Sequence, residues 1–135
     1  VKIIYPVHPN PNVKNLADKF FKESSNIAII EPLDYGKFVW LMSKSYLIIT
    51  DSGGIQEEAP SLGKPVLVTR DKTERPEAVE AGTVILVGNN MNKIIEKASM
   101  LISNQSEYKK MSKLINPYGD GKASDRILKL IKKLI

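Results

Sequence analysis

Five short apolar runs, each followed by a segment with helical spacing, constrain the fold of this chain more than any other feature. The runs cover residues 1–7, 26–30, 46–50, 65–69 and 83–87. They are polar on neither face, which is typical of strands buried on both sides of a parallel sheet. Strands that alternate with helices predict an α/β fold, a doubly wound parallel sheet of the Rossmann-like type with right-handed crossovers.

The helices of this predicted fold lie between and after the apolar runs. Three are expected to begin near residues 13, 35 and 54, and a short fourth one to follow a loop within residues 73–80, with Pro76 in its first turn. Three more are expected to cover residues 94–102, 105–114 and 127–135. We expect the helix that begins near Gly54 to be short, because Pro60 lacks the N–H that a helix interior needs. Ligands bind beyond the C-terminal ends of the strands in such sheets. Those ends fall at His8, Glu31–Pro32, Asp51–Gly54, Arg70–Arg75 and Gly88.

The composition excludes several kinds of site. The 135 residues include no cysteine and one histidine, His8, which excludes disulfides, thiolate nucleophiles and zinc sites built from cysteine or several histidines. The net charge is +5, but the densest basic group is on the terminal helix and has no aromatic residues interleaved to stack on bases. We therefore predict no nucleic-acid partner and no metal.

Length and hydropathy predict one domain, residues 1–135, with no membrane partner. No apolar run approaches the roughly 20 residues that cross a bilayer, and no segment resembles a signal peptide. We expect a cytoplasmic protein on these grounds. The sequence opens at Val1 directly on an apolar run, without an initiator methionine, so we also expect it to be cut from a longer chain.

The segment Thr50–Gly54 is the most informative local feature. Gly53 and Gly54 follow a predicted strand and precede a predicted helix, where the backbone can come close to an anion and point free N–H groups at it. Ser52 adds a hydroxyl donor. The segment is neither a GxGxxG motif nor a P-loop. An alternative is a tight turn that needs its glycines only for their dihedral angles.

Residues around this turn supply further binding groups. Glu58 lies one helical turn past Gly54, and its carboxylate matches a ribose diol, whereas Glu57 is expected on a solvated acidic face. Arg75 follows the next strand and is suited to a phosphate, unless it pairs with Glu74 or Glu77. Phe38 follows another strand end and is suited either to stacking on a base or to the core. Together these residues predict a nucleotide-diphosphate site without a nucleophile–base pair.

The sequence resembles the non-hydrolysing UDP-N-acetylglucosamine 2-epimerases in blocks that span nearly the whole chain in family order. The blocks are Pro6–Pro11, Glu31–Phe38, Thr50–Pro60, Leu62–Val68, Arg70–Asp71, Thr73–Glu77 and Asn116–Gly121. This resemblance implies the C-terminal half of a two-domain, GT-B-like enzyme with a UDP-sugar in its cleft. It also implies that the chain's own N-terminal domain and a second copy, in a homodimer, are its partners.

The resemblance further implies roles for individual residues. Ser52, Gly53 and Gly54 would hold the phosphates of UDP, Glu58 the ribose, and Arg75 would line the site as a cation. Uracil would pack on Phe38 and meet the backbone near Leu33. His8 is similar to a histidine that lines a second, allosteric UDP-N-acetylglucosamine site in some members, although most partners of that site are absent from this chain.

The family inverts C2 of UDP-N-acetylglucosamine to give UDP-N-acetylmannosamine without a cofactor. The C2 proton is removed, UDP is eliminated to leave 2-acetamidoglucal, and UDP adds back with protonation on the opposite face. The acid–base residues are expected in the N-terminal half, so this chain is predicted to hold no catalytic residue and to be inactive alone. A GT-B glycosyltransferase, a hydrolysing epimerase and a stand-alone binding module are the alternatives.

Overall fold

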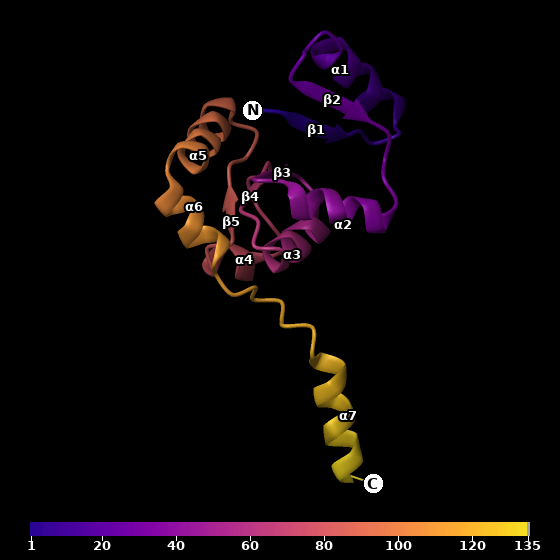
Figure 1. The fold of residues 1–135 in the computed structure, drawn as a ribbon, viewed down its shortest axis with the longest axis vertical. Helices are drawn as coiled ribbons and strands as arrows, with labels where there is room; N and C mark the ends of the chain where they lie inside the picture. Colours follow the sequence, from indigo (N-terminus) through magenta and orange to yellow (C-terminus); the bar gives the residue numbers. More distant parts are fainter. Residues whose placement is uncertain (135) are drawn as a thin grey trace. The chain divides into compact units, whose positions relative to one another are not determined.

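The structure, a computed structural model, describes residues 1–134 as two compact units. The first unit ends at Leu41 and the second begins at Met42, so the boundary falls within a helix, α2 (Tyr35–Lys44). Each unit contains parallel strands connected through helices (Figure 1). None of the helices within residues 1–134 is long and apolar enough to cross a bilayer.

The first unit is built on two parallel strands and one helix. Its elements in chain order are β1 (Ile3–Pro6), α1 (Pro11–Phe21) and β2 (Ile27–Ile30), followed by the start of α2. α1 begins at Pro11 because the Asn10 side chain accepts a hydrogen bond from the N–H of Asn12 at 2.9 Å. Val7 and Ala17 are its most deeply buried residues, and Tyr5 meets Phe21 edge to face.

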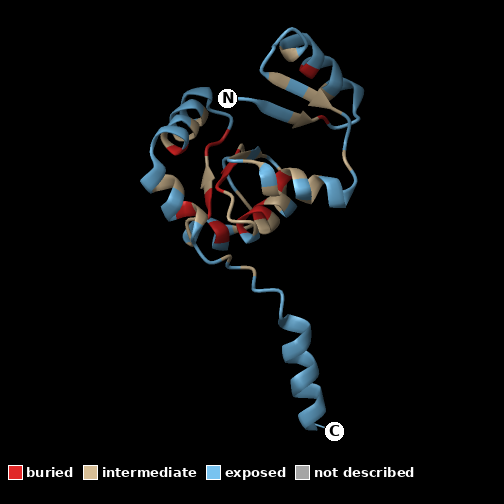
Figure 2. Cartoon of the chain, viewed as in Figure 1, coloured by how far each residue is buried: buried red, intermediate tan, exposed pale blue. Residues whose placement is uncertain are grey.

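The second unit contains a three-stranded parallel sheet in the order β3–β4–β5. The central strand, β4, is completely buried, and the buried residues gather on and around it (Figure 2). The remaining elements are β3 (Ile48–Thr50), α3 (Gly53–Ser61), β4 (Val66–Val68), α4 (Pro76–Glu80), β5 (Val84–Leu86), α5 (Met91–Ser103), α6 (Gln105–Ser112) and α7 (Ala123–Leu134).

Helices cover both faces of this sheet, as in a doubly wound fold. Leu67 of β4 packs in a cluster with Leu101 of α5 and Met111 of α6, whereas α3 packs on β4 from the other side (Figure 1). Successive residues of a strand point to opposite faces, so Val66 and Val68 face the side opposite to Leu67. The predicted α/β class and all five predicted strands are confirmed, and the pairings within each sheet are parallel. The expectation that the strands are buried on both sides is confirmed for β4 and is wrong for the other strands of residues 1–134, which have exposed or half-buried residues.

The register of the second sheet aligns the C-terminal ends of its strands. Thr50 pairs with Val68, and Val68 pairs with Leu86, so the three strands end at the same edge. The segment that leads into α3 and the loop that leads into α4 both leave from this edge. α3 runs one residue past Pro60, which lies in its last turn, so the prediction of a short helix is confirmed.

Candidate functional site

The first turn of α3 has an open end. Ser52 is the N-cap residue with φ −79° and ψ 133°, and its side chain makes no capping hydrogen bond to the helix. Its own N–H is held by the hydroxyl of Thr50 at 3.1 Å. The first N–H groups of a helix have no partner within the helix, and the helix dipole places about half a positive charge there. The Ser52 hydroxyl and these N–H groups are thus available to an anion.

The two glycines of this turn are not required by its dihedral angles. The positive-φ glycines of the described chain are all elsewhere, so the alternative that Gly53 and Gly54 serve only an unusual turn is wrong. A Cβ on Gly53 would collide with the Glu74 carboxylate. A Cβ on Gly54 would meet nothing closer than Glu58 Oε1, at 3.9 Å. The protein thus has room for a side chain at Gly54, and the glycine leaves this side of the first turn of α3 uncovered.

Glu58 lies beside this opening, as the helical spacing predicts. Its carboxylate oxygen is within 4 Å of the position that a Cβ on Gly54 would take. The side chain is half-buried and makes no hydrogen bond or ion pair with another residue in the part of the chain that the structure describes. A carboxylate with free acceptor positions at this place can receive two hydroxyl groups.

Arg75 is held as a cation at the end of the neighbouring loop. It is the residue before α4, and its Nε donates to the carboxylate of Glu57 while its Nη1 donates to the backbone carbonyl of Glu74 at 3.2 Å. The hydrogen bond that Arg75 donates to the Glu57 carboxylate raises the pKa of Arg75 above its ordinary value. Nη2 has no protein partner within residues 1–134 and is therefore available to a ligand.

The expectation for Glu57 was wrong. Its side chain does not belong to a solvated acidic face but forms the ion pair with Arg75, with both side chains about two-thirds buried. Neither Glu74 nor Glu77, the predicted alternative partners, pairs with Arg75 through its carboxylate. Glu74 accepts a hydrogen bond from Arg75 with its backbone carbonyl, and its carboxylate accepts one from Arg70. Helical spacing alone places Glu57 on α3 but does not show which loop folds onto it.

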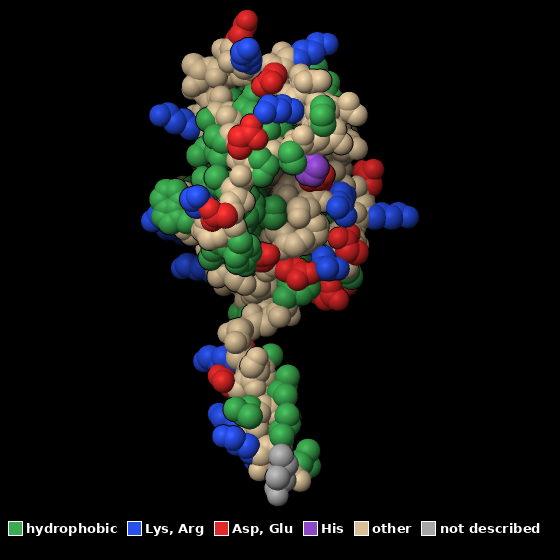
Figure 3. All heavy atoms as spheres, turned by 90° about the vertical axis from the view of Figure 1, so that its right-hand side faces the viewer, with side chains coloured by type: hydrophobic (Ala, Val, Ile, Leu, Met, Phe, Trp, Pro, Cys, Tyr) green, Lys and Arg blue, Asp and Glu red, His purple; other side chains and the backbone are tan. Residues whose placement is uncertain are grey.

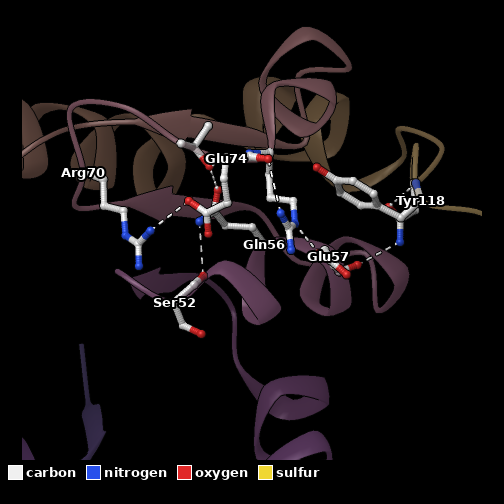
Figure 4. Close-up of polar contacts among 9 residues, drawn as sticks. Ser52, Gln56, Glu57, Arg70, Glu74 and Tyr118 are labelled. Atoms are coloured by element: carbon white, nitrogen blue, oxygen red, sulfur yellow. Dashed lines mark hydrogen bonds and ion pairs between the residues drawn. The ribbon is translucent and has the colours of Figure 1, made fainter.

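A second acidic group lies against the start of α3. The carboxylate of Glu74 touches Gly53 and pairs with Arg70 Nη1 at 2.9 Å (Figure 4). The pKa of Glu74 is lowered, first by a hydrogen bond from its own backbone N–H and further by the charges of Arg70 and Arg75. The Glu74 carboxylate and its partner Arg70 therefore place one negative and one positive charge next to the first residue of α3.

Sequence reasoning missed the buried polar residue that connects these parts. Gln56 is completely buried, and its Nε2 donates to the Ser52 carbonyl at 3.2 Å (Figure 4). Its Oε1 accepts from the Thr73 hydroxyl at 2.6 Å, and that hydroxyl accepts from the Arg75 N–H at 3.0 Å. The sequence did contain a signal for its burial, because Gln56 lies three residues before the apolar Ala59 and therefore on the same side of the helix.

Asn116 provides a second connection, from the turn before α7 to α3. Its Nδ2 donates to the Glu57 carbonyl at 2.9 Å and to the Ser61 hydroxyl, while its Oδ1 accepts from the Tyr118 N–H at 3.2 Å. The predicted turn at residues 116–121 is confirmed, and Gly119 and Gly121 have the positive φ that such a turn uses. This turn is thereby fixed to the helix that carries Glu57 and Glu58.

The other predicted site residues belong to the first unit. Leu33 and Phe38 are half-buried, before and within α2, and the Phe38 N–H donates to the Asp34 carbonyl at 2.9 Å. His8 is exposed, and its Nδ1 accepts from the Asn10 N–H at 3.2 Å. The roles of these three residues stay predictions.

Two hollows on the surface lie away from the start of α3. One, of about 500 Å³, lies at the C-terminal end of α3 and is lined by Pro60, Ser61, Gly63, Ser112, Leu114 and the 116–121 turn. The other, of about 360 Å³, belongs to the first unit, between α1 and β2. Neither includes Ser52, Glu58 or Arg75, so the predicted anion site does not coincide with either hollow.

Comparison with known proteins identifies the family. A family model described as UDP-N-acetylglucosamine 2-epimerase matches residues 1–132. The UDP-N-acetylglucosamine 2-epimerase of Yersinia pestis is 58% identical over 132 residues, which are 98% of this chain and 35% of that protein. The chain thus spans about a third of the length of the curated relatives it matches.

Solved structures agree with this family. The crystal structure of a Listeria monocytogenes protein described as a putative UDP-N-acetylglucosamine 2-epimerase superposes with a TM-score of 0.93 at 49% identity, over 98% of this chain and 36% of that one. The Neisseria meningitidis UDP-GlcNAc 2-epimerase, bound to UDP-GlcNAc, superposes with a TM-score of 0.91 at 53% identity over the same shares. The predicted GT-B-like fold class is confirmed. By its sequence blocks, its fold and the family model that covers it, the chain belongs to the UDP-N-acetylglucosamine 2-epimerase family.

Proposed function

We propose that this chain is the UDP-binding C-terminal part of an enzyme that interconverts UDP-N-acetylglucosamine and UDP-N-acetylmannosamine. The observation that carries the proposal is the start of α3, where Ser52 makes no capping hydrogen bond, two glycines follow it, and hydrogen bonds through Gln56 and Thr73 connect it to Arg75. The Neisseria relative, which shares the fold at 53% identity, is bound to UDP-GlcNAc. In this proposal residues 1–135 contribute nucleotide binding and the acid–base groups lie in the rest of the protein.

The diphosphate of UDP is proposed to bind at the start of α3. Ser52 and the amides of Gly53 and Gly54 donate to phosphate oxygens, Arg75 supplies a positive charge, and Glu58 accepts the ribose hydroxyls. Free N–H groups at a helix N-terminus and an arginine fork are the donors that bind phosphates in proteins. The proposed roles of Phe38 and Leu33 at uracil, and of His8 at an allosteric or cleft-lining position, come from the family resemblance.

These groups have a direct part in the proposed reaction. When a base removes the C2 proton, the bond between C1 and the UDP oxygen breaks and the electron pair leaves with UDP, which becomes an anion with one more negative charge. Donors fixed in advance around the leaving oxygen stabilise that charge without rearrangement. The same donors hold UDP until it adds back to C1 and C2 is protonated on the opposite face.

A single experiment on the intact protein tests this function. UDP-N-acetylglucosamine is supplied without an acceptor in D₂O, and the products are followed by proton NMR. We expect UDP-N-acetylmannosamine that carries deuterium at C2, because the proton returned at C2 comes from the solvent. Free N-acetylmannosamine with UDP would indicate a hydrolysing enzyme instead, and no turnover without an acceptor would contradict the proposal and favour a glycosyltransferase.

Ser52→Ala separates binding from stability. A serine N-cap normally contributes about 1 kcal/mol through its capping hydrogen bond, but that bond is absent here. We expect the free energy of unfolding of the variant to stay within about 0.5 kcal/mol of the wild type. We expect UDP to bind about ten-fold more weakly, since one hydrogen bond to an anion, about 1.5 kcal/mol, is lost. Calorimetric titration with UDP and thermal unfolding measure the two effects, and a destabilised variant with unchanged affinity would contradict this expectation.

The exposed apolar face of α7 supports the proposal that the rest of the protein is a partner of this chain. Ile127, Leu128, Leu130, Ile131 and Leu134 are between 46% and 86% exposed, and no residue of α7 is buried. Apolar side chains follow one side of this helix and basic side chains the other (Figure 3). We propose the N-terminal domain as the partner of this face, and propose a homodimer and a cytoplasmic location for the whole protein.

A further inference from the structure

The buried Gln56 has both ends of its carboxamide bonded. Nε2 donates to the Ser52 carbonyl at 3.2 Å, and Oε1 accepts from the Thr73 hydroxyl at 2.6 Å (Figure 4). The residue is 0% exposed, so either end would lose a hydrogen bond without gaining water if it turned. The carbonyl of Ser52 accepts only, which fixes the orientation of the amide. Gln56 is therefore a rigid link between the start of α3 and the loop that carries Thr73.

The link continues to Arg75 through the Thr73 hydroxyl. This oxygen accepts a hydrogen bond from the Arg75 backbone N–H at 3.0 Å, and its own O–H donates one to Gln56 Oε1. The backbone of Arg75, at φ −124° and ψ 60°, is in neither a helix nor a strand, so regular structure does not hold it. The hydrogen bonds run from Arg75 through the Thr73 hydroxyl and the Gln56 side chain to the Ser52 carbonyl.

We propose that Gln56 and Thr73 are positioning residues that hold Arg75 at a fixed place relative to Ser52. Ser52 and Arg75 can then bind the same diphosphate. This inference rests on the proposed function, because it needs a diphosphate at the start of α3. Neither residue touches the ligand. Both act through the backbone of residues that do, and buried hydrogen-bond chains of this kind give a site one fixed arrangement.

Removing the Thr73 hydroxyl breaks the link at its centre. Thr73→Val has nearly the same shape but lacks the hydroxyl, so Gln56 Oε1 and the Arg75 N–H both lose their partner. We expect the affinity of the intact protein for UDP to fall about ten-fold, since mutations in a hydrogen-bond network that do not touch the ligand have effects of about two- to 30-fold. Thr73→Ser keeps the hydroxyl and is expected to bind within two-fold of the wild type.

The matched control is another buried threonine hydroxyl in the same unit. Thr83 is 1% exposed, and its hydroxyl donates to the Ala78 carbonyl at 3.1 Å, outside the link. Thr83→Val is expected to lower the melting temperature and to leave UDP affinity within two-fold. If Thr83→Val weakens UDP binding as much as Thr73→Val does, the effect is one of general stability and the inference is overturned.

A double-mutant cycle with Arg75→Ala supplies the decisive readout. Because Thr73 acts mainly through Arg75, the ten-fold effect of Thr73→Val is expected to shrink to two-fold or less when Arg75 is already alanine. Equal effects in both backgrounds would overturn the inference. Thr73→Ala, which also lacks the hydroxyl, is measured in parallel in case Thr73→Val does not fold.

The failure of this inference is distinguishable from the failure of the proposed function. A wild-type protein that does not bind UDP contradicts the proposed function itself. A wild-type protein that binds UDP, beside a folded Thr73→Val or Thr73→Ala variant that binds equally well, overturns the link alone.

Discussion

Arg75→Ala is expected to weaken UDP binding by the intact protein about 100-fold. A hydrogen bond to a charged group contributes about 1.5–3 kcal/mol, and an arginine fork can make two of them to a diphosphate, so the loss approaches 3 kcal/mol. Glu57 and the Glu74 carbonyl already hold the guanidinium in place, so little ordering of the side chain is needed on binding. Calorimetric titration with UDP measures the effect.

Two further variants show whether the effect of Arg75 depends on its shape as well as its charge. Arg75→Lys keeps the charge but loses the planar fork, so we expect an intermediate loss of about ten-fold. Arg126→Ala removes an arginine whose partner is the exposed Asp120, outside the site, and should leave UDP affinity unchanged. Binding by Arg75→Ala within three-fold of the wild type would show that Arg75 does not contact the diphosphate.

Gly54→Ala is expected to bind UDP at least ten-fold more weakly while the protein becomes no less stable. The φ of Gly54 is not positive, and an added Cβ meets nothing closer than Glu58 Oε1 at 3.9 Å, so the free protein accommodates alanine. Alanine in a helix is up to about 1 kcal/mol more favourable than glycine. The added methyl group instead occupies the side of the helix start from which the nucleotide is proposed to approach.

Gly36→Ala calibrates the stability part of this prediction. Gly36, like Gly54, is the second residue of its helix, and a Cβ there would make only an ordinary contact with Asp34 Oδ1 at 3.7 Å. Thermal unfolding of both variants compares the gain from the same substitution at equivalent positions. If Gly54→Ala binds UDP as the wild type does, the phosphates do not approach the first turn of α3.

The strands and helices could be predicted because their signals are local. Continuous apolar runs predicted all five strands, and apolar residues at helical spacing predicted most of the helices of residues 1–134. The short helix within residues 73–80 was instead placed by Pro76, and the helix at residues 105–114 was placed in a polar stretch. The boundaries were less certain. The third run was predicted from Tyr46, but Tyr46 instead stacks on Tyr108 and donates to the Leu101 carbonyl, and the strand begins at Ile48.

The residues of the candidate site that could be predicted from the sequence are those that lie together on one segment of the chain. Ser52, Gly53, Gly54 and Glu58 all belong to a single strand-to-helix segment, whose geometry follows from its own residues. The partners of Arg75 and the contacts of Gln56 and Asn116 depend on how loops 17 to 59 residues away fold onto α3. Such pairings are set by tertiary packing, and an exposed-looking glutamate or a turn asparagine gives no local sign of them.

The position of Glu74 connects the free and the bound site. Its carboxylate sits against Gly53 and is balanced by Arg70, so the start of α3 already has an anion near it. A carboxylate is stabilised at a helix N-terminus for the same reason that a phosphate is. If UDP binds here as proposed, its diphosphate takes a place that the Glu74 carboxylate already neighbours in the free protein.

A crystal structure of the intact protein with UDP tests most directly whether the diphosphate binds at the start of α3. We predict phosphate oxygens about 3 Å from the amide nitrogens of Gly53 and Gly54 and from the Arg75 guanidinium, with the ribose hydroxyls on Glu58. A diphosphate bound elsewhere, with the first turn of α3 still facing Glu74, would contradict the account.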